Sequence, residues 1–166
     1  RQCLHRGAGE ARVKLALVGD IGGTNARFAL WREQRVEAVR VLPTRDYARP
    51  EDAVRAYLGE IGLAVGDLAA VCLACAGPVT GDEFRFTNNH WRLSRKAFRE
   101  ALGLDELLLI NDFSAMALGV TRLGAGELLE VCPGHSDPDL PRLVIGPGTG
   151  LGVGGILACS NVIASE

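Results

Sequence analysis

A glycine-rich turn directly after an apolar run is the feature that most restricts the fold of this chain. Residues 13–18 form the apolar run, and residues 19–25 read Gly-Asp-Ile-Gly-Gly-Thr-Asn. Gly22 and Gly23 have no Cβ atom, so the backbone can turn sharply and bring its N–H groups against an anion. Asp20 would repel that anion unless a cation lay between them, and a phosphate bridged by Mg²⁺ satisfies both. The pattern predicts a phosphate-binding loop; a plain β-turn in a hairpin is the alternative, because another apolar run follows.

A second turn of the same type lies near the carboxyl end of the chain. Residues 146–152 read Gly-Pro-Gly-Thr-Gly-Leu-Gly after a short apolar run, so Gly148, Thr149 and Gly150 lie where a strand ends and its amides need partners. Two such loops could hold a polyphosphate from both sides. A dinucleotide-binding loop is the alternative, but it requires a helix after the last glycine. The residues after Gly152 are apolar and typical of an extended strand.

Asn111 and Asp112 follow a third apolar run, residues 107–110. An unbroken run of this kind is typical of a strand buried on both faces, and ligands of open α/β sheets bind beyond the carboxyl ends of such strands. An amide there can bind a hydroxyl group, and a carboxylate can accept its proton. The alternative is that Asp112 only caps the helix expected over residues 113–120.

The apolar periodicity predicts a mixed α/β fold. Three strands joined by short turns come first and form an antiparallel meander, and two more strands follow, each reached through a helix. Pro50 and Ser94 begin these helices, which end at Gly62 and Gly103. The five predicted strands span residues 13–18, 27–31, 35–42, 68–76 and 107–110.

Five short motifs occur along the chain in one order. They are Gly-Asp-Ile-Gly-Gly-Thr-Asn-Ala-Arg-Phe at 19–28, Ala-Gly-Pro-Val at 76–79, Thr87 and Asn88 with Trp91, Ile-Asn-Asp-Phe at 110–113, and the glycine turn at 146–152. In this combination residues 13–166 resemble the bacterial ATP-dependent glucokinase family. The resemblance implies a ribonuclease-H-like (actin-like/hexokinase) α/β fold with a mixed five-stranded sheet. Asn25 disfavours the related ROK sugar kinases and repressors, which commonly have Lys there.

The resemblance also implies the transfer of a phosphoryl group from ATP to the 6-hydroxyl of glucose. Asp112 is the expected general base, and Asp20 is expected to orient Mg²⁺ through water. Arg27 could brace Asp20 or reach a phosphate. The residues expected to bind ATP are Gly19, Asp20, Ile21, Gly22, Gly23, Thr24, Asn25, Gly148, Thr149 and Gly150. Those expected to bind glucose are Gly77, Pro78, Asn111, Asp112 and Glu166.

Members of that family are longer and close a sugar cleft between two lobes, so the chain is expected to be an amino-terminal fragment. Glu166 would begin the family's Glu-Gly-Gly-His sugar motif. The expected division is an extension over residues 1–12, a small lobe with the phosphate loop and the Asn-Asp motif over 13–122, and the truncated start of the large lobe over 123–166. A homodimer is implied for the full-length protein.

Composition and charge exclude other classes. The net charge is −2 and no basic stripe is present, which disfavours nucleic-acid binding. No apolar stretch is long enough for a membrane span or a secretion signal, so a cytoplasmic protein is expected. The cysteines are odd in number, and Cys72 and Cys75 lie inside an apolar run, where Cys is expected to be a small hydrophobic residue. His90 and His135 are not expected to act as catalytic bases.

Two other classes of protein could use the same loops. One is a sugar-kinase-like regulator that binds a hexose without turnover, and Asp112 disfavours it. The other is an actin-like assembly ATPase, which has no need to bind sugar hydroxyls. Asn111 and Asp112, together with the motif at 76–79, therefore disfavour the second class.

Overall fold

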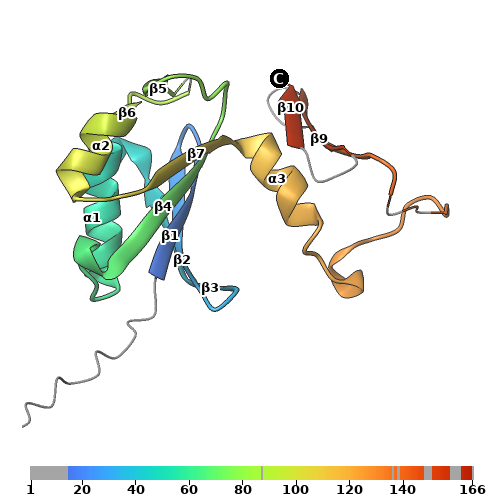
Figure 1. Ribbon diagram of the computed structural model, residues 1–166, viewed down its shortest axis with the longest axis horizontal. Helices are drawn as coiled ribbons and strands as arrows, with labels where there is room; N and C mark the ends of the chain where they lie inside the picture. Colours follow the sequence, from blue (N-terminus) through green and yellow to red (C-terminus); the bar gives the residue numbers. More distant parts are fainter. Residues whose placement is uncertain are drawn as a thin grey trace, which may run out of the picture.

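The computed structural model describes residues 15–86, 88–135, 137, 139–147, 151–157 and 162–165. A five-stranded sheet in the order β3-β2-β1-β4-β7 forms its first part (Figure 1). The first three strands are antiparallel, whereas β4 runs parallel to β1 and β7 parallel to β4. The strands are β1 (Leu15–Ile21), β2 (Asn25–Arg32), β3 (Arg35–Pro43), β4 (Leu68–Cys75) and β7 (Leu107–Asn111). The predicted mixed sheet is therefore confirmed, and its strand order is that of the ribonuclease-H-like fold.

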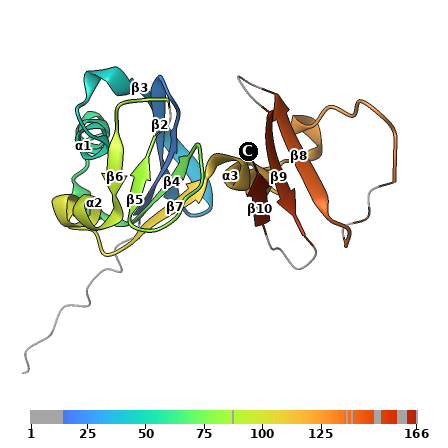
Figure 2. The same ribbon diagram turned by 90° about the horizontal axis from the view of Figure 1, so that it is seen from above.

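Two helices, α1 (Pro50–Glu60) and α2 (Arg95–Leu102), cover one face of this sheet (Figure 2). The Ser94 hydroxyl accepts a hydrogen bond from the N–H of Ala97 at 3.1 Å and so caps α2. Gly103 ends α2 with a φ of 63°, a left-handed conformation that glycine adopts at little cost. The helix ends predicted from Pro50, Ser94 and Gly103 are confirmed.

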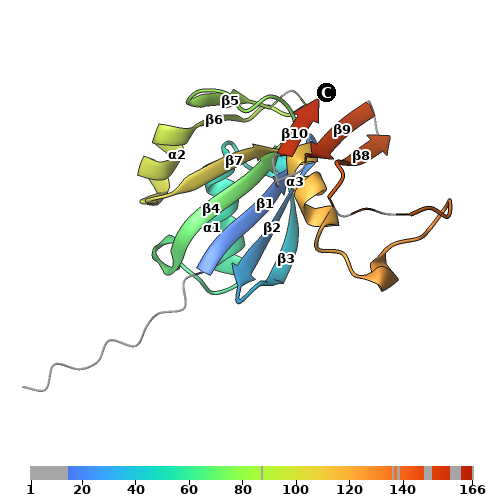
Figure 3. The ribbon, with the colours of Figure 1, turned by 45° about the vertical axis from the view of Figure 1, so that its right-hand side comes forward.

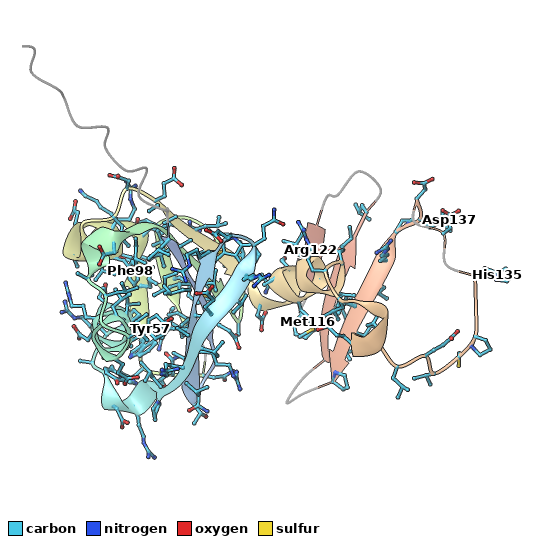
Figure 4. All side chains as sticks on the ribbon, turned by 90° about the horizontal axis from the view of Figure 1, so that it is seen from below. Tyr57, Phe98, Met116, Arg122, His135 and Asp137 are labelled. Carbon is cyan, nitrogen blue, oxygen red and sulfur yellow. The ribbon has the colours of Figure 1, made fainter. Side chains whose placement is uncertain are left out.

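The core lies between these helices and the sheet. Tyr57 of α1 and Phe98 of α2 are fully buried and point toward the strands (Figure 4). They meet Leu17, Phe28 and Leu73, which come from β1, β2 and β4. Full burial of one such side chain contributes about 1.5–3 kcal/mol. This core holds β1 and β4, whose ends carry the candidate site.

A shorter hairpin and three single turns connect these elements. The hairpin strands β5 (Glu83–Arg85) and β6 (Arg92–Ser94) are antiparallel. The turns are the 3₁₀ segments η1 (Thr44–Asp46), η2 (Val65–Asp67) and η3 (Ala125–Glu127). No helix in the described part of the chain is long and apolar enough to cross a bilayer.

Helix α3 (Asp112–Val120) leads from β7 to a second, three-stranded sheet, against which it packs (Figures 1 and 2). That sheet is antiparallel in the order β10-β9-β8, with β8 (Arg142–Pro147), β9 (Leu151–Ile156) and β10 (Val162–Ser165). The strand β9 starts where a dinucleotide loop would need a helix, which excludes the dinucleotide alternative. The lobe boundary near residue 122 stays a prediction.

Candidate active site

Three parallel strands end side by side at one edge of the large sheet (Figure 3). Ile21 of β1 is in register with Cys75 of β4, and Cys75 is in register with Asn111 of β7. The first glycine turn, the turn at Gly77 and the pair Asn111–Asp112 therefore begin at the same edge. Ligands of open α/β sheets bind at such edges.

The carbonyl groups of the first glycine turn are held by two side chains from elsewhere in the chain. The Asn89 amide donates to the carbonyl oxygen of Gly22 at 3.0 Å. The Thr44 hydroxyl lies 3.0 Å from the carbonyl oxygen of Gly23 and 3.1 Å from that of Thr24. The backbone N–H of Thr44 also donates to the carbonyl oxygen of Thr24 at 2.9 Å. These contacts fix the carbonyl side of the turn against the protein.

The N–H groups of the turn are arranged differently. The N–H of Gly22 donates to the carbonyl oxygen of Asn25 at 2.9 Å, which closes the turn and leaves this group unavailable to a phosphate. Among the described residues, no backbone carbonyl or side chain accepts a hydrogen bond from the N–H of Gly23 or Thr24. A turn whose carbonyl groups are bonded, and whose N–H groups at two neighbouring residues have no acceptor in the described part of the chain, is suited to an anion.

Two glycines of this motif meet close neighbours. A Cβ atom on Gly23 would lie 2.8 Å from the Cβ atom of Asn88, and one on Gly19 would lie 2.7 Å from a methyl group of Leu73. Ile21 is buried. Gly19 and Ile21 therefore face the buried core. Their predicted contact with ATP stays a prediction.

The sequence gives no sign that Asn89 positions the loop, although Asn89 lies between two residues of a family motif, Asn88 and Trp91. Its side-chain oxygen accepts the N–H of Trp91 at 2.8 Å, and Trp91 is buried. In the full-length protein, Asn89→Ala is expected to raise the KM for ATP about fivefold to tenfold, because each lost hydrogen bond is worth about 1 kcal/mol. The KM for glucose should change little.

Asn88→Ala is the matched control for Asn89→Ala. It keeps the Cβ atom that lies against Gly23 and leaves the hydrogen bonds of Asn89 in place. Steady-state kinetics with ATP as the varied substrate compare the two variants. Equal KM values for ATP in both would show that Asn89 does not position the loop.

Asp20 and Arg27 form an ion pair beside the turn. They are cross-strand partners in β1 and β2, and the Arg27 guanidinium lies 3.0 Å from the Asp20 carboxylate. Both side chains are about half exposed, at 52% and 56%, so the pair itself stabilises the fold little. Of the two roles open for Arg27, the structure shows the bracing of Asp20.

Asp20→Ala in the full-length protein is expected to raise the Mg²⁺ concentration needed for half-maximal rate by about tenfold, because Mg²⁺ takes only one or two carboxylates beside phosphate oxygens. Glucose affinity should stay unchanged, because Asp20 belongs to the glycine turn. Titration of Mg²⁺ at fixed glucose and ATP measures the effect. An unaltered Mg²⁺ dependence would remove Asp20 from this role.

Asn111 and Asp112 lie at the start of α3. The alternative from the sequence is that Asp112 caps this helix, and the structure shows otherwise. The Asn111 side-chain oxygen accepts the N–H of Ser114 at 3.0 Å, so Asn111, and not Asp112, is the cap of the helix. The Asn111 amide also donates to the carbonyl oxygen of Gly77 at 3.3 Å. The Asp112 carboxylate accepts the N–H of Phe113 at 2.9 Å. Capping thus falls to Asn111, while Asp112 lies at the first position of the helix.

Cys75 of β4 is in register with Asn111 of β7. It is fully buried, and burial, followed by the negative charges of Asp112 and Asp20, raises the pKa of its thiol to about 12. Burial also raises the pKa of Cys72. Both cysteines are free thiols inside β4, and Cys75 is buried, as expected for a small hydrophobic residue of a strand.

The turn at Gly77 and Pro78 borders an open groove of about 460 Å³. Gly77 has a φ of 118°, which a residue with a Cβ atom would adopt only under strain. The other side of the groove is formed by Glu83, Phe84 and Arg85. A larger hollow of about 1310 Å³ lies away from this edge, between α3 and the uncovered face of the sheet. The smaller groove, and not the larger hollow, therefore borders a turn of the candidate site.

In the described contacts, neither His90 nor His135 meets Asp20 or Asp112. A ring nitrogen of His90 lies 2.9 Å from the carbonyl oxygen of Tyr47, and His135 lies in the long loop before β8 (Figure 4). No group of three or more metal-ligating side chains occurs among the residues that the structure describes. Four predicted site residues lie outside the described residues: Gly148, Thr149, Gly150 and Glu166. Thr87 of the family motif also lies outside them.

The strand order and the turns at its edge define an actin-like protein of the ribonuclease-H-like class. A family model described as Glucokinase matches residues 17–165. The glucokinase of Pseudomonas paraeruginosa is 64% identical over 143 residues, which are 86% of this chain and 42% of that protein. The chain belongs to the glucokinase family. It spans less than half the length of this relative.

The solved structures similar to this one include two glucokinases. The glucokinase of an Antarctic psychrotroph has a TM-score of 0.81 and 33% identity, over 92% of this chain and 50% of that chain. A ROK family glucokinase of Streptomyces griseus, whose crystal structure contains glucose and AMPPNP, has a TM-score of 0.64 and 25% identity, over 92% of this chain and 47% of that chain. The predicted resemblance and fold are confirmed by these matches.

Proposed function

We propose that the full-length protein containing this chain transfers the γ-phosphoryl group of ATP to the 6-hydroxyl of glucose. The observation that carries the proposal is the alignment of the first glycine turn, the Gly77 turn and Asp112 at one sheet edge. Membership of the glucokinase family supports it, as does the similar ROK enzyme that binds glucose and an ATP analogue. Phosphoryl transfer depends mainly on positioning and charge stabilisation, which such an edge can supply.

On the phosphate side, the turn at residues 22–24 would bind a phosphate oxygen with the N–H groups of Gly23 and Thr24. Asp20 fits a water-mediated contact to Mg²⁺, because it is a single carboxylate beside an anion-binding turn. Mg²⁺ bound to ATP would neutralise charge on the phosphate oxygens. Gly148, Thr149 and Gly150 are proposed to hold the other side of the ATP phosphates.

On the sugar side, Asp112 would accept the proton of the 6-hydroxyl as the oxygen attacks the γ-phosphorus. Its hydrogen bond from the N–H of Phe113 fixes the orientation of the carboxylate. Asn111 would bind a sugar hydroxyl while it also holds the helix start and the Gly77 turn. Gly77, Pro78 and Glu166 complete the proposed sugar contacts.

A coupled assay of ADP release by the full-length protein tests this function. We expect ADP release that depends on both Mg·ATP and glucose. Glucose binding with no ADP release would instead favour the sugar-binding regulator. ADP release that is independent of glucose would favour the assembly ATPase.

The cytoplasmic location and the homodimer are part of the same proposal. A protein that uses ATP and free glucose would meet both in the cytoplasm. Sedimentation of the full-length protein at several concentrations tests the homodimer. A single monomeric species at all concentrations would contradict it.

A further inference from the structure

Phe113 fills a space that three glycines of the second sheet leave open. A Cβ atom on Gly146 would lie 2.7 Å from its ring, and one on Gly152 would overlap the ring. A Cβ atom on Gly154 would lie 2.5 Å from the carbonyl oxygen of Phe113 and 3.3 Å from the Cβ atom of Ala117. Real Cβ atoms do not approach this closely, so the glycines allow α3 to lie directly on the β8–β9 backbone.

The ring lies at the base of the second glycine turn. Gly146 of β8 and Gly152 of β9 are cross-strand partners, and the next pair, Pro147 and Leu151, leads into residues 148–150. The contact is therefore made two residues before the turn on β8 and two residues after it on β9. The position of the ring sets the position of both strands that carry the turn.

Phe113 also holds the carboxylate next to it in the sequence. Its backbone N–H donates to the Asp112 carboxylate at 2.9 Å, in the first turn of α3. One residue thus contacts Asp112 through its backbone and the β8–β9 hairpin through its ring. No other described residue combines these two contacts.

We propose that Phe113 is a positioning residue that sets the separation between the Asp112 carboxylate and the β8–β9 hairpin at Gly146 and Gly152. The inference rests on the proposed function, in which the carboxylate accepts the sugar proton and the turn holds the ATP phosphates. Donor and acceptor must then approach in line, and a misplacement of about 1 Å can cost about 10²-fold in rate. Gly146 and Gly152 accordingly leave the space that the Phe113 ring occupies, in addition to any role in the turn.

Phe113→Leu in the full-length protein tests this role. Leucine keeps an apolar side chain but fills less of the space beside Gly146 and Gly152. We expect kcat to fall about 10²-fold while the KM values for glucose and ATP stay within about threefold. Met116→Leu is the control, since Met116 is on the same helix and its sulfur atom lies near Gly146. It should keep kcat within about twofold. Phe113→Met serves the same test if the leucine variant does not fold.

A double-mutant cycle with Gly152→Ala separates positioning from loss of stability. Gly152→Ala alone should displace the ring and lower kcat by at least about tenfold. Added to Phe113→Ala, it should cause no further loss, because the ring that the methyl group displaces is gone. Melting temperatures of all variants are measured in parallel.

Three outcomes would overturn the positioning role. They are a kcat within about twofold of the wild type for Phe113→Leu, a rise in KM alone, or additive losses in the cycle. A wild-type protein that does not phosphorylate glucose would overturn the proposed function, and the positioning role with it. An active wild type with unaffected Phe113 variants would overturn the positioning role alone.

Discussion

Asp112→Asn in the full-length protein is expected to lower kcat by about 10²–10⁴-fold and to leave glucose affinity within about threefold. An amide at this position can still bind the sugar hydroxyl, but it cannot accept the proton. The backbone hydrogen bond from Phe113 can be kept, because an amide oxygen also accepts an N–H. Steady-state kinetics give kcat, and titration calorimetry with glucose gives the affinity.

Asp105→Asn is the matched control for this substitution. Asp105 is exposed and precedes the opposite end of β7, so its substitution removes one negative charge at the far end of that strand from the site. The control should keep the wild-type kcat. Retention of more than about half of kcat in Asp112→Asn would exclude the general-base role, since a base contributes about 10² or more.

The chain of residues 1–166, expressed alone, is expected to show no measurable phosphorylation of glucose. Its 143 matched residues cover 42% of the Pseudomonas paraeruginosa glucokinase, and a competent site needs both walls of the cleft to exclude water and to align the reacting groups. A coupled assay for glucose 6-phosphate, at enzyme concentrations about 10²-fold above those used for the full-length protein, measures the difference.

The same chain is expected to self-associate. Large apolar side chains are exposed on the uncovered face of the first sheet and on β8, and contiguous exposed apolar surface favours association. They include Trp31, Val36, Leu108, Leu143 and Ile145. Sedimentation velocity of the purified chain detects the association. Robust turnover by a monodisperse monomer would show that the catalytic site needs no residues beyond 166.

The order of the elements could be predicted because its signals are local. Ser94 and Gly103 lie within one turn of the helix that they delimit, and the strand at 107–110 is one continuous apolar run. The meander of β1, β2 and β3 follows from short turns between neighbouring strands. The aligned strand ends followed in turn from this order, since parallel strands place their carboxyl ends at one edge.

The residues that hold the site in shape could not be predicted in the same way. Thr44 reaches Gly23 across 21 residues and Asn89 reaches Gly22 across 67 residues, and periodicity carries no information over such separations. Gly146 and Gly152 were interpreted as parts of a phosphate turn, whereas the structure shows that Phe113 occupies the space beside them. The sequence does not distinguish a glycine that leaves space for a distant ring from a glycine that is needed in a turn.

The fate of the γ-phosphoryl group tests the central claim most directly. The full-length protein is incubated with glucose and ATP labelled at the γ-phosphate in the presence of Mg²⁺, and the labelled product is identified by chromatography and phosphorus NMR. We predict that the label is found on the 6-hydroxyl of glucose, and that Asp112→Asn nearly abolishes its transfer. Label released as inorganic phosphate at a rate independent of glucose would contradict the account.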